Sequence, residues 1–385
     1  MKQNLPINPD ILKWARETLC IPVEEVARRL NKAPEIIKQW EEGIGSPTYI
    51  QLETLAYKIF KRPIAIFFFP SPPEEKKPES SFRTFPKSLI HELSPSFFFI
   101  YRQAEAMQIN LNELSNGTNP APRRIFDDLD FSLNERASSM VRKVRDYLRI
   151  TLDDQMGWRN ADVAFRTWRK SFEECGIFVF KEAFKQEDIS GFCLFDKVFP
   201  IIYVNNSMPM TRQIFTLFHE LAHILFKIGG IDIRQEDFIG RLRGDNRKIE
   251  VLCNRLTADF LVPHEDFKRR ISSIKVQDQE IQNLARLYKV SREVILRKVL
   301  DMGLINQVVY EEKSKQWTEE ARKWRSRGKG GNYYSTKASY LGDSYLKLTF
   351  QKYYQHKINE NQLADYLGIK VNSIPGIELA TMRKG

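Results

Sequence analysis

Cysteine and long hydrophobic runs are both scarce in this sequence. The 385 residues include only four cysteines, and no two of them form a Cys-x-x-Cys pair, which argues against both a disulfide framework and a thiolate zinc knuckle. The longest apolar runs, at 64–69 and 97–101, are far too short to span a bilayer. The first residues lack the apolar core of a signal peptide. We therefore expect a cytoplasmic protein without a membrane partner.

Acidic residues are also outnumbered. The sequence has 49 aspartates and glutamates against 60 lysines and arginines, which gives a net charge of +11. This balance favours contact with a polyanion, such as nucleic acid or an acidic protein surface. The hydrophobic fraction of 42% supports real cores, and the length predicts two or three domains.

A proline-rich and charged stretch at 70–81 predicts a linker with a domain on each side. Before it, helical patterns at 22–30, 34–40 and 49–60 are joined by short turns. Two short helices joined by a tight turn are typical of a helix-turn-helix.

In a helix-turn-helix of this kind, the second helix enters the major groove of DNA. Glu35, Lys38 and Gln39 are therefore candidate base contacts, and Lys32 is a candidate phosphate contact. Four nearby glutamates would repel the DNA backbone: Glu24, Glu25, Glu41 and Glu42. The alternative interpretation is a small domain that docks a protein partner.

Strands and helices alternate in the middle of the chain. Apolar runs at 176–180, 191–195 and 199–204 predict three strands, and two long apolar helices are predicted at 211–226 and 249–261. The polar loop between these helices contains four glycines and is predicted to be mobile.

One short pattern recurs three times along the chain. Segments 25–37, 283–295 and 362–374 share an alanine, a set of apolar positions and a turn. Each segment could form two short helices joined by a turn. Short helical pairs also look alike by chance, so a shared fold and a shared role in DNA binding are separate hypotheses.

Two histidines one helical turn apart give the strongest functional signal. His219 and His223 lie at i and i+4 in an apolar helix, so both rings can bind one cation. A catalytic zinc site needs a third protein ligand, and Glu250 is the best candidate because it lies on the polar stripe of the next long helix. Asn254, one turn later, is placed to hydrogen-bond a ligand histidine.

Glu220 projects away from the side of the helix that holds the two histidines, so we expect it to act as a base rather than a ligand. It would take a proton from a zinc-activated water and pass it to the leaving amine, which predicts peptide hydrolysis without a covalent intermediate. The alternative is that the motif occurs by chance and that both histidines are ordinary core residues.

Three stretches resemble the ImmA/IrrE family of bacterial metallopeptidases: Val204-Asn205-Asn206-Ser207, the segment Arg212-Gln213-Ile214-Phe215-Thr216-Leu217-Phe218-His219-Glu220-Leu221-Ala222-His223, and Glu250-x-x-Cys253-Asn254-x-x-Thr257-Ala258-x-x-Leu261-Val262-Pro263. The resemblance implies one catalytic Zn²⁺, with two histidines and a glutamate as ligands and a glutamate as base. Residues 11–60 likewise resemble a Cro/repressor-type (XRE) helix-turn-helix domain. Cys253 and Val262 depart mildly from the family pattern, and neither change removes a ligand.

The resemblance also implies a narrow substrate range. Characterised relatives cut a helix-turn-helix repressor, so the expected partner is such a repressor, encoded nearby, and possibly DNA through the N-terminal domain. If the strand at 199–204 lies at the sheet edge, it could pair with an extended substrate segment. The alternative function is a DNA-binding regulator or antitoxin-like partner whose zinc site is structural or rarely catalytic.

Together these features predict an α+β, multidomain chain. We expect an all-α helix-turn-helix domain, a minimal zincin-like peptidase domain with a small sheet and an active-site helix, and a mainly helical C-terminal region. The predicted divisions are a helix-turn-helix domain at 1–70, a linker and helical connector at 71–130, the peptidase domain at 131–270, a helix-turn-helix-like segment at 271–310, and a basic, helical region at 311–385.

Overall fold

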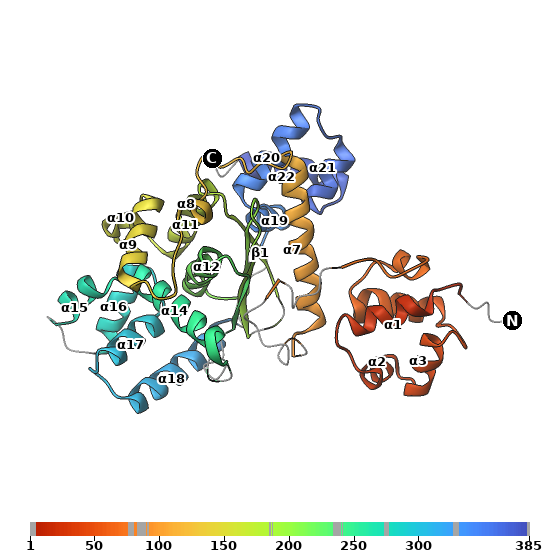
Figure 1. Cartoon of the computed structure of the whole chain (residues 1–385), viewed down its shortest axis with the longest axis horizontal. Coiled ribbons are helices and arrows are strands. Elements are labelled where there is room, and N and C mark those ends of the chain that lie inside the picture. Colours follow the sequence, from red (N-terminus) through yellow and green to blue (C-terminus); the bar gives the residue numbers. More distant parts are fainter. Residues whose placement is uncertain are drawn as a thin grey trace. The chain divides into compact units, whose positions relative to one another are not determined.

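The computed structural model describes residues 5–75, 81–82, 90, 92–184, 186, 188–233, 240, 242–272, 277–325 and 331–382. Part of the predicted linker and part of the glycine-containing loop fall outside these residues. The chain forms two compact units, one of residues 1–106 with 184–186 and one of residues 107–183 with 187–385 (Figure 1). The predicted division into five segments remains a prediction. No described helix is long and apolar enough to cross a membrane.

The regular elements described wholly within the first unit are all helical: α1 (Pro9–Glu17), α2 (Val23–Leu30), α3 (Pro34–Glu41), α4 (Tyr49–Glu53), the π-helical η1 (Thr54–Phe60) and the 3-10 helix η2 (Ile64–Phe68). Proline occupies the first position of α1 and of α3, where its missing N–H costs no hydrogen bond. Thr48 and Gln51 form a capping box at the start of α4. The predicted helices are confirmed here, whereas a helix-turn-helix domain that binds DNA remains a prediction.

The three repeated segments share one backbone turn. In each, a helix ends at a residue in the left-handed conformation: Asn31 after α2, Lys289 after α16 (Asp278–Tyr288) and Gly368 after α21 (Glu360–Leu367). The amide of the next residue then donates to the carbonyl of the shared alanine in all three segments, at Ala27, Ala285 and Ala364. This pattern closes the helix end. The three segments therefore share this helix-ending turn, and their interpretation as helix-turn-helix units remains a prediction.

The second unit is built around a four-stranded sheet of β1 (Phe178–Glu182), β2 (Ile189–Leu194), β3 (Ile201–Asn205) and β4 (Gly230–Ile233). The strand order is β1-β3-β2-β4, with β1 parallel to β3 and the other two pairings antiparallel. The hypothesis that 199–204 forms an edge strand is wrong, because β3 lies between β1 and β2. Among the described strands, the edges are β1 and β4.

The fourth strand corrects a second expectation. Residues 230–233 were expected to belong to a mobile loop, but they form β4 and pair with β2. The alternation of Ile231 and Ile233 with small or polar residues suits a short strand with one face on a core. The preceding glycines hid that alternation, because glycine clusters usually indicate a turn.

The sheet has two buried faces with different partners. Val179, Ile202 and Cys193 lie in register on one face, and they pack in the main apolar core with helices α11 (Ala161–Glu174) and α12 (Met210–Leu225). Phe180, Tyr203 and Phe192 form the matching row on the other face. Tyr345 of α20 (Asp343–Tyr354) covers this row, with its ring 5.4 Å from that of Phe180. Helices α11 and α12 therefore cover one face of the sheet, and the C-terminal helix α20 covers the other.

The remaining helices surround this core: α7 (Pro95–Leu114, of which the second unit holds the part from Met107), α8 (Ile125–Asp128), α9 (Ala137–Leu148), α10 (Leu152–Gly157), α14 (Gly244–Leu261), α15 (His264–Ile271), α17 (Arg292–Asp301), α18 (Gln307–Arg325), α19 (Tyr333–Leu341), α20 (Asp343–Tyr354), the 3-10 helix η3 (Val371–Ser373) and α22 (Ile374–Met382). The α+β prediction is confirmed for this unit. The C-terminal region is mainly helical in its described residues, as expected.

Arg169 ties the C-terminal region to the sheet. Its guanidinium donates to the carbonyl of Val179 in β1 and, at 2.6 Å, to the carbonyl of Ser339 in α19. It also forms a buried ion pair with Glu173 at 3.0 Å. Gly342 follows α19 with a φ of +87°, and a Cβ there would lie 2.0 Å from the Arg169 guanidinium. Only glycine therefore fits beside this arginine.

Candidate metal centre

The helix α12 carries both histidines and is buried along most of its length. His219 and His223 are 2% and 0% exposed, so neither ring is a surface group. Their Nε2 atoms lie 3.2 Å apart, as expected for residues one turn apart on one side of a helix. The predicted convergence of the two rings is thus present in the structure.

Glu250 completes the cluster from α14, which packs against α12. Its two carboxylate oxygens lie 3.4 Å from Nε2 of His219 and 3.3 Å from Nε2 of His223. The side chain is almost fully buried. One donor atom from each of the three residues lies within 4.8 Å of the others, so the group could hold a metal ion.

The donor set fits a divalent transition metal. Ligand atoms bound tetrahedrally to zinc are about 3.3 Å apart, given bonds near 2.0 Å, and the separations at this cluster are 3.2–3.4 Å. Two imidazole nitrogens and one carboxylate oxygen form a common catalytic zinc set that leaves one position open. The Nδ1 atoms of His219 and His223 have no hydrogen-bond partner among the described residues, although both atoms are buried.

The charges of the three groups are strongly coupled. Burial favours a neutral His219, yet Asp232 and Glu250 raise the pKa of His219 above its usual value. Burial likewise opposes protonation of His223, but Cys253 and Glu250 raise its pKa well above the usual value. Burial works against the ionised form of Glu250, and the two histidines nevertheless lower its pKa. A divalent cation would replace protons that these groups otherwise share.

Glu220 lies beside the cluster without belonging to it. Its side chain is fully buried, and neither carboxylate oxygen has a hydrogen-bond partner among the described residues. Burial raises the pKa of Glu220, while the two histidines partly oppose that shift. The Cys193 thiol, a weak donor, lowers the pKa of Glu220 slightly. A buried carboxylate without a strong donor is costly for stability, and proteins retain such groups more often for chemistry than for packing.

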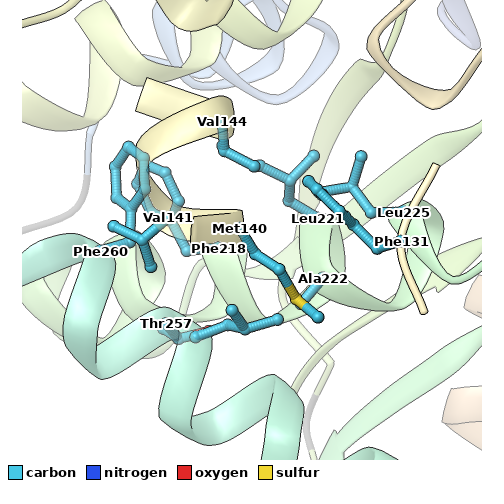
Figure 2. A pocket seen from close by; sticks show the side chains of 11 residues that line it. Phe131, Met140, Val141, Val144, Phe218, Leu221, Ala222, Leu225, Thr257 and Phe260 are labelled. Carbon is cyan, nitrogen blue, oxygen red and sulfur yellow. The ribbon is translucent and has the colours of Figure 1, made fainter. Parts of the chain in front are cut away.

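An apolar layer packs against α12 next to the cluster. Phe218 of α12 stacks on Phe260 of α14, with ring centroids 4.2 Å apart. The ring of Trp168 meets Phe218 edge-on, with centroids 4.9 Å apart. Figure 2 shows Met140, Val141 and Val144 of α9 converging with Leu221 and Leu225 on an apolar pocket beside these rings. Its volume of about 20 Å³ leaves little freedom for α12 to shift.

The edge strand β4 touches the cluster directly. A Cβ built on Gly230 would lie 2.5 Å from the ring of His223, so the strand approaches this closely only because residue 230 is glycine. Asp232 of the same strand accepts hydrogen bonds from Arg212 at 2.6 Å and from Thr216 at 2.8 Å, both on α12. These contacts cannot be found from the sequence, because Gly229 and Gly230 hide the strand pattern of β4.

The other predicted site residues are not members of the three-residue cluster. The structure gives no hydrogen bond between Asn254 and either histidine; Asn254 instead lines a groove described below. Glu35, Lys38 and Gln39 are exposed on α3, and Lys32 is exposed in the turn before it. Of the four glutamates expected to oppose DNA, Glu25 pairs with Arg28 and Arg29, and Glu41 pairs with Arg16.

The sequence around this cluster matches a known protein family. Residues 172–300 match the family of the IrrE N-terminal-like domain, a peptidase family. The match spans β1 to α17, about one third of the chain, and contains the whole cluster. This IrrE-like part is therefore a metallopeptidase-like domain. A comparison with curated proteins found no match.

Proposed function

We propose that the chain is a zinc-dependent endopeptidase that cleaves a helix-turn-helix repressor or a similar regulatory protein. The observation that carries this proposal is the buried cluster of His219, His223 and Glu250, with the Glu220 carboxylate beside it. A purely structural zinc site needs no base. The match to a peptidase family supports the same reaction class.

Each residue then has a defined role. His219, His223 and Glu250 would hold the zinc ion, which when bound supplies a Lewis acid for the attacking water and the scissile carbonyl. Glu220 would accept the proton of that water at a carboxylate oxygen and return it to the leaving nitrogen. A zinc ion bound beside Glu220 would favour the ionised carboxylate, the form that can accept a proton.

The edge strand β4 offers a place for substrate backbone. It pairs only with β2 among the described strands, so its other side can form main-chain hydrogen bonds with an extended peptide. Gly230 lies next to His223, which would bring such a peptide to the cluster. Methylating alternate backbone amides of a cleaved peptide should raise KM by about tenfold. An unchanged KM with every methylated peptide would argue against the pairing.

The proposal is tested with the zinc-loaded full chain and the repressor-type protein encoded beside its gene. We expect a single cut by the wild-type protein and a rate at least about 10²-fold lower for Glu220→Gln, because the base is lost while all three ligands remain. Mass spectrometry of the fragments reports the cut. Zinc content measured on both proteins provides the control.

Two results would contradict the proposal. One is cleavage at an equal rate by Glu220→Gln, which would point to a contaminating protease. The other is intact substrate with wild-type protein whose zinc content is one ion per chain, tested against each neighbouring regulator. Removal of zinc by a chelator should abolish cleavage, and added zinc should restore it.

A second candidate function is DNA binding by the first unit. Lys32, Lys38 and Gln39 are exposed, and arginines on the same unit neutralise Glu25 and Glu41, which weakens the expected repulsion of DNA. A mobility shift on the DNA upstream of the gene tests this function. Lys32→Ala with Lys38→Ala should weaken the shift, and no shift with wild-type protein at low salt would exclude it.

A further inference from the structure

A large groove crosses the described part of the second unit. It has a volume of about 1820 Å³ and is lined by residues of α9, α12, α14, α17 and α18 (labelled in Figure 1). Pockets for small molecules usually measure about 300–1,000 Å³. The groove is therefore large enough for a segment of polypeptide.

One end of the groove adjoins the metal centre. Phe215 lines it and lies one turn before His219, with the two rings stacked at 6.4 Å. Val251 and Asn254 also line the groove. Val251 directly follows Glu250 in the sequence, and Asn254 lies one helical turn after Glu250. A polypeptide in the groove would thus lie against the helices that carry all three ligands.

The wall near α9 and α14 carries positive charge. Arg136, Arg142 and Arg247 are exposed and line the groove, and they form no ion pair within the ranges that the structure describes. Several like charges on one wall repel each other and attract carboxylates from a ligand. The groove is therefore complementary to an acidic segment.

Apolar side chains lie among these arginines. Leu133 and Val251 both line the groove and are 41% and 47% exposed. Such side chains suit a protein ligand that brings apolar residues of its own. The groove also contains the exposed carboxylates of Glu265 and Glu293. These two groups repel carboxylates as well as phosphates, so the acidic residues of a ligand would lie at the arginine wall. Leu133 and Val251 need apolar groups to cover them, so a protein segment fits better than nucleic acid.

We propose that this groove binds an acidic, partly apolar segment of the protein substrate and holds that protein while another part of its chain reaches the metal centre. The inference rests on the proposed peptidase function for the identity of the ligand. Binding in the groove is separate from cleavage, so each can be measured alone.

The test uses the full-length Glu220→Gln protein loaded with zinc and a fluorescein-labelled 20-residue peptide of glutamate, alanine and leucine at helical spacing. Fluorescence anisotropy should show binding. The charge-reversed variant Arg136→Glu, Arg142→Glu, Arg247→Glu should weaken binding by about tenfold or more, because three attractive contacts become repulsive. A peptide with lysine in place of glutamate should bind more weakly to the unreversed protein.

A matched control variant reverses the same number of positive charges elsewhere on this unit. Arg159, Arg166 and Lys347 are exposed and lie outside the groove, and their replacement by glutamate should change binding by no more than about twofold. Equal thermal midpoints and zinc contents show that both variants are folded. Equal weakening of peptide binding by the two variants would overturn the proposal. Tighter binding of the lysine peptide, or of a DNA duplex of about 20 base pairs, than of the glutamate peptide would overturn it as well.

The failure of this inference is distinguishable from failure of the peptidase proposal. If the repressor is cut at an unchanged KM by the groove variant that retains Glu220, the groove is not the docking site and the enzyme assignment stands. If the acidic peptide binds as described but no regulator is cut, the groove stands and the peptidase assignment fails.

Discussion

Gly230 sets the distance between the edge strand β4 and His223. We predict that Gly230→Ala weakens zinc binding by about 10–100-fold, the range seen when the surroundings of a ligand are disturbed. The reason is that the added methyl would lie 2.5 Å from the His223 ring, which must turn away. Competition with a chromogenic chelator measures the affinity.

Gly157→Ala is the control for that substitution, because a Cβ at Gly157 meets no atom within 4 Å. It should leave zinc affinity unchanged. Equal affinities for Gly230→Ala and wild type would mean that the His223 ring is not held by the strand.

At the residue scale, the sequence predicted the metal cluster well. His219 and His223 are found from helical spacing alone, and Glu250 from an unusual carboxylate on an apolar helix. The role of Gly230 could not be predicted in this way, because its importance depends on a contact between two elements. The zinc identity and the roles of Glu220 and Asn254 remain predictions.

At the element scale, one buried carboxylate fixes β4 to α12. We predict that Asp232→Ala lowers the free energy of unfolding by about 2–4 kcal/mol, because Thr216 and Arg212 lose their shared acceptor in a buried site. Urea unfolding measures the change. Zinc affinity should fall as well, since Gly230 belongs to the same strand.

A double-mutant cycle with Arg212→Ala isolates this pair. A coupling energy of about 1–3 kcal/mol is expected, since the two side chains are in direct contact. Additive effects of the two substitutions would show that the pair contributes nothing specific to the attachment of β4.

The elements differ in how far sequence patterns reveal them. The long apolar helix α12 and the apolar strands were predicted within a few residues, because burial imposes a clear period. The strand order was not predictable. β3 lies between β1 and β2 and pairs in parallel with β1, although β2 comes between β1 and β3 in the sequence. Such an order depends on contacts that no local pattern encodes.

At the scale of the whole second unit, the C-terminal helix α19 is held to the sheet by Arg169. We predict that Arg169→Met lowers the free energy of unfolding by about 3–5 kcal/mol, because Glu173 is left as a buried charge without its partner. Burial already raises the pKa of Glu173. Urea unfolding at neutral pH checks the value.

The double variant Arg169→Met, Glu173→Leu serves as the control. It should recover part of the lost stability, because both buried charges are then absent. A single variant as stable as the wild type would show that Arg169 does not hold α19 to the sheet. The packing of α19 on β1 was not predicted, since the two elements lie more than 150 residues apart in sequence.

Because Tyr345 packs on the aromatic row of the sheet, this row is synthesised well before the helix that covers it. At translation rates of about 5–20 residues per second, Tyr345 follows β1 out of the ribosome by roughly 10 to 30 s. During that interval, Phe180, Tyr203 and Phe192 have no covering helix from the C-terminal region. The sheet of the nascent chain therefore exposes these aromatic side chains until Tyr345 is synthesised, and the second unit completes its core only when translation is nearly finished.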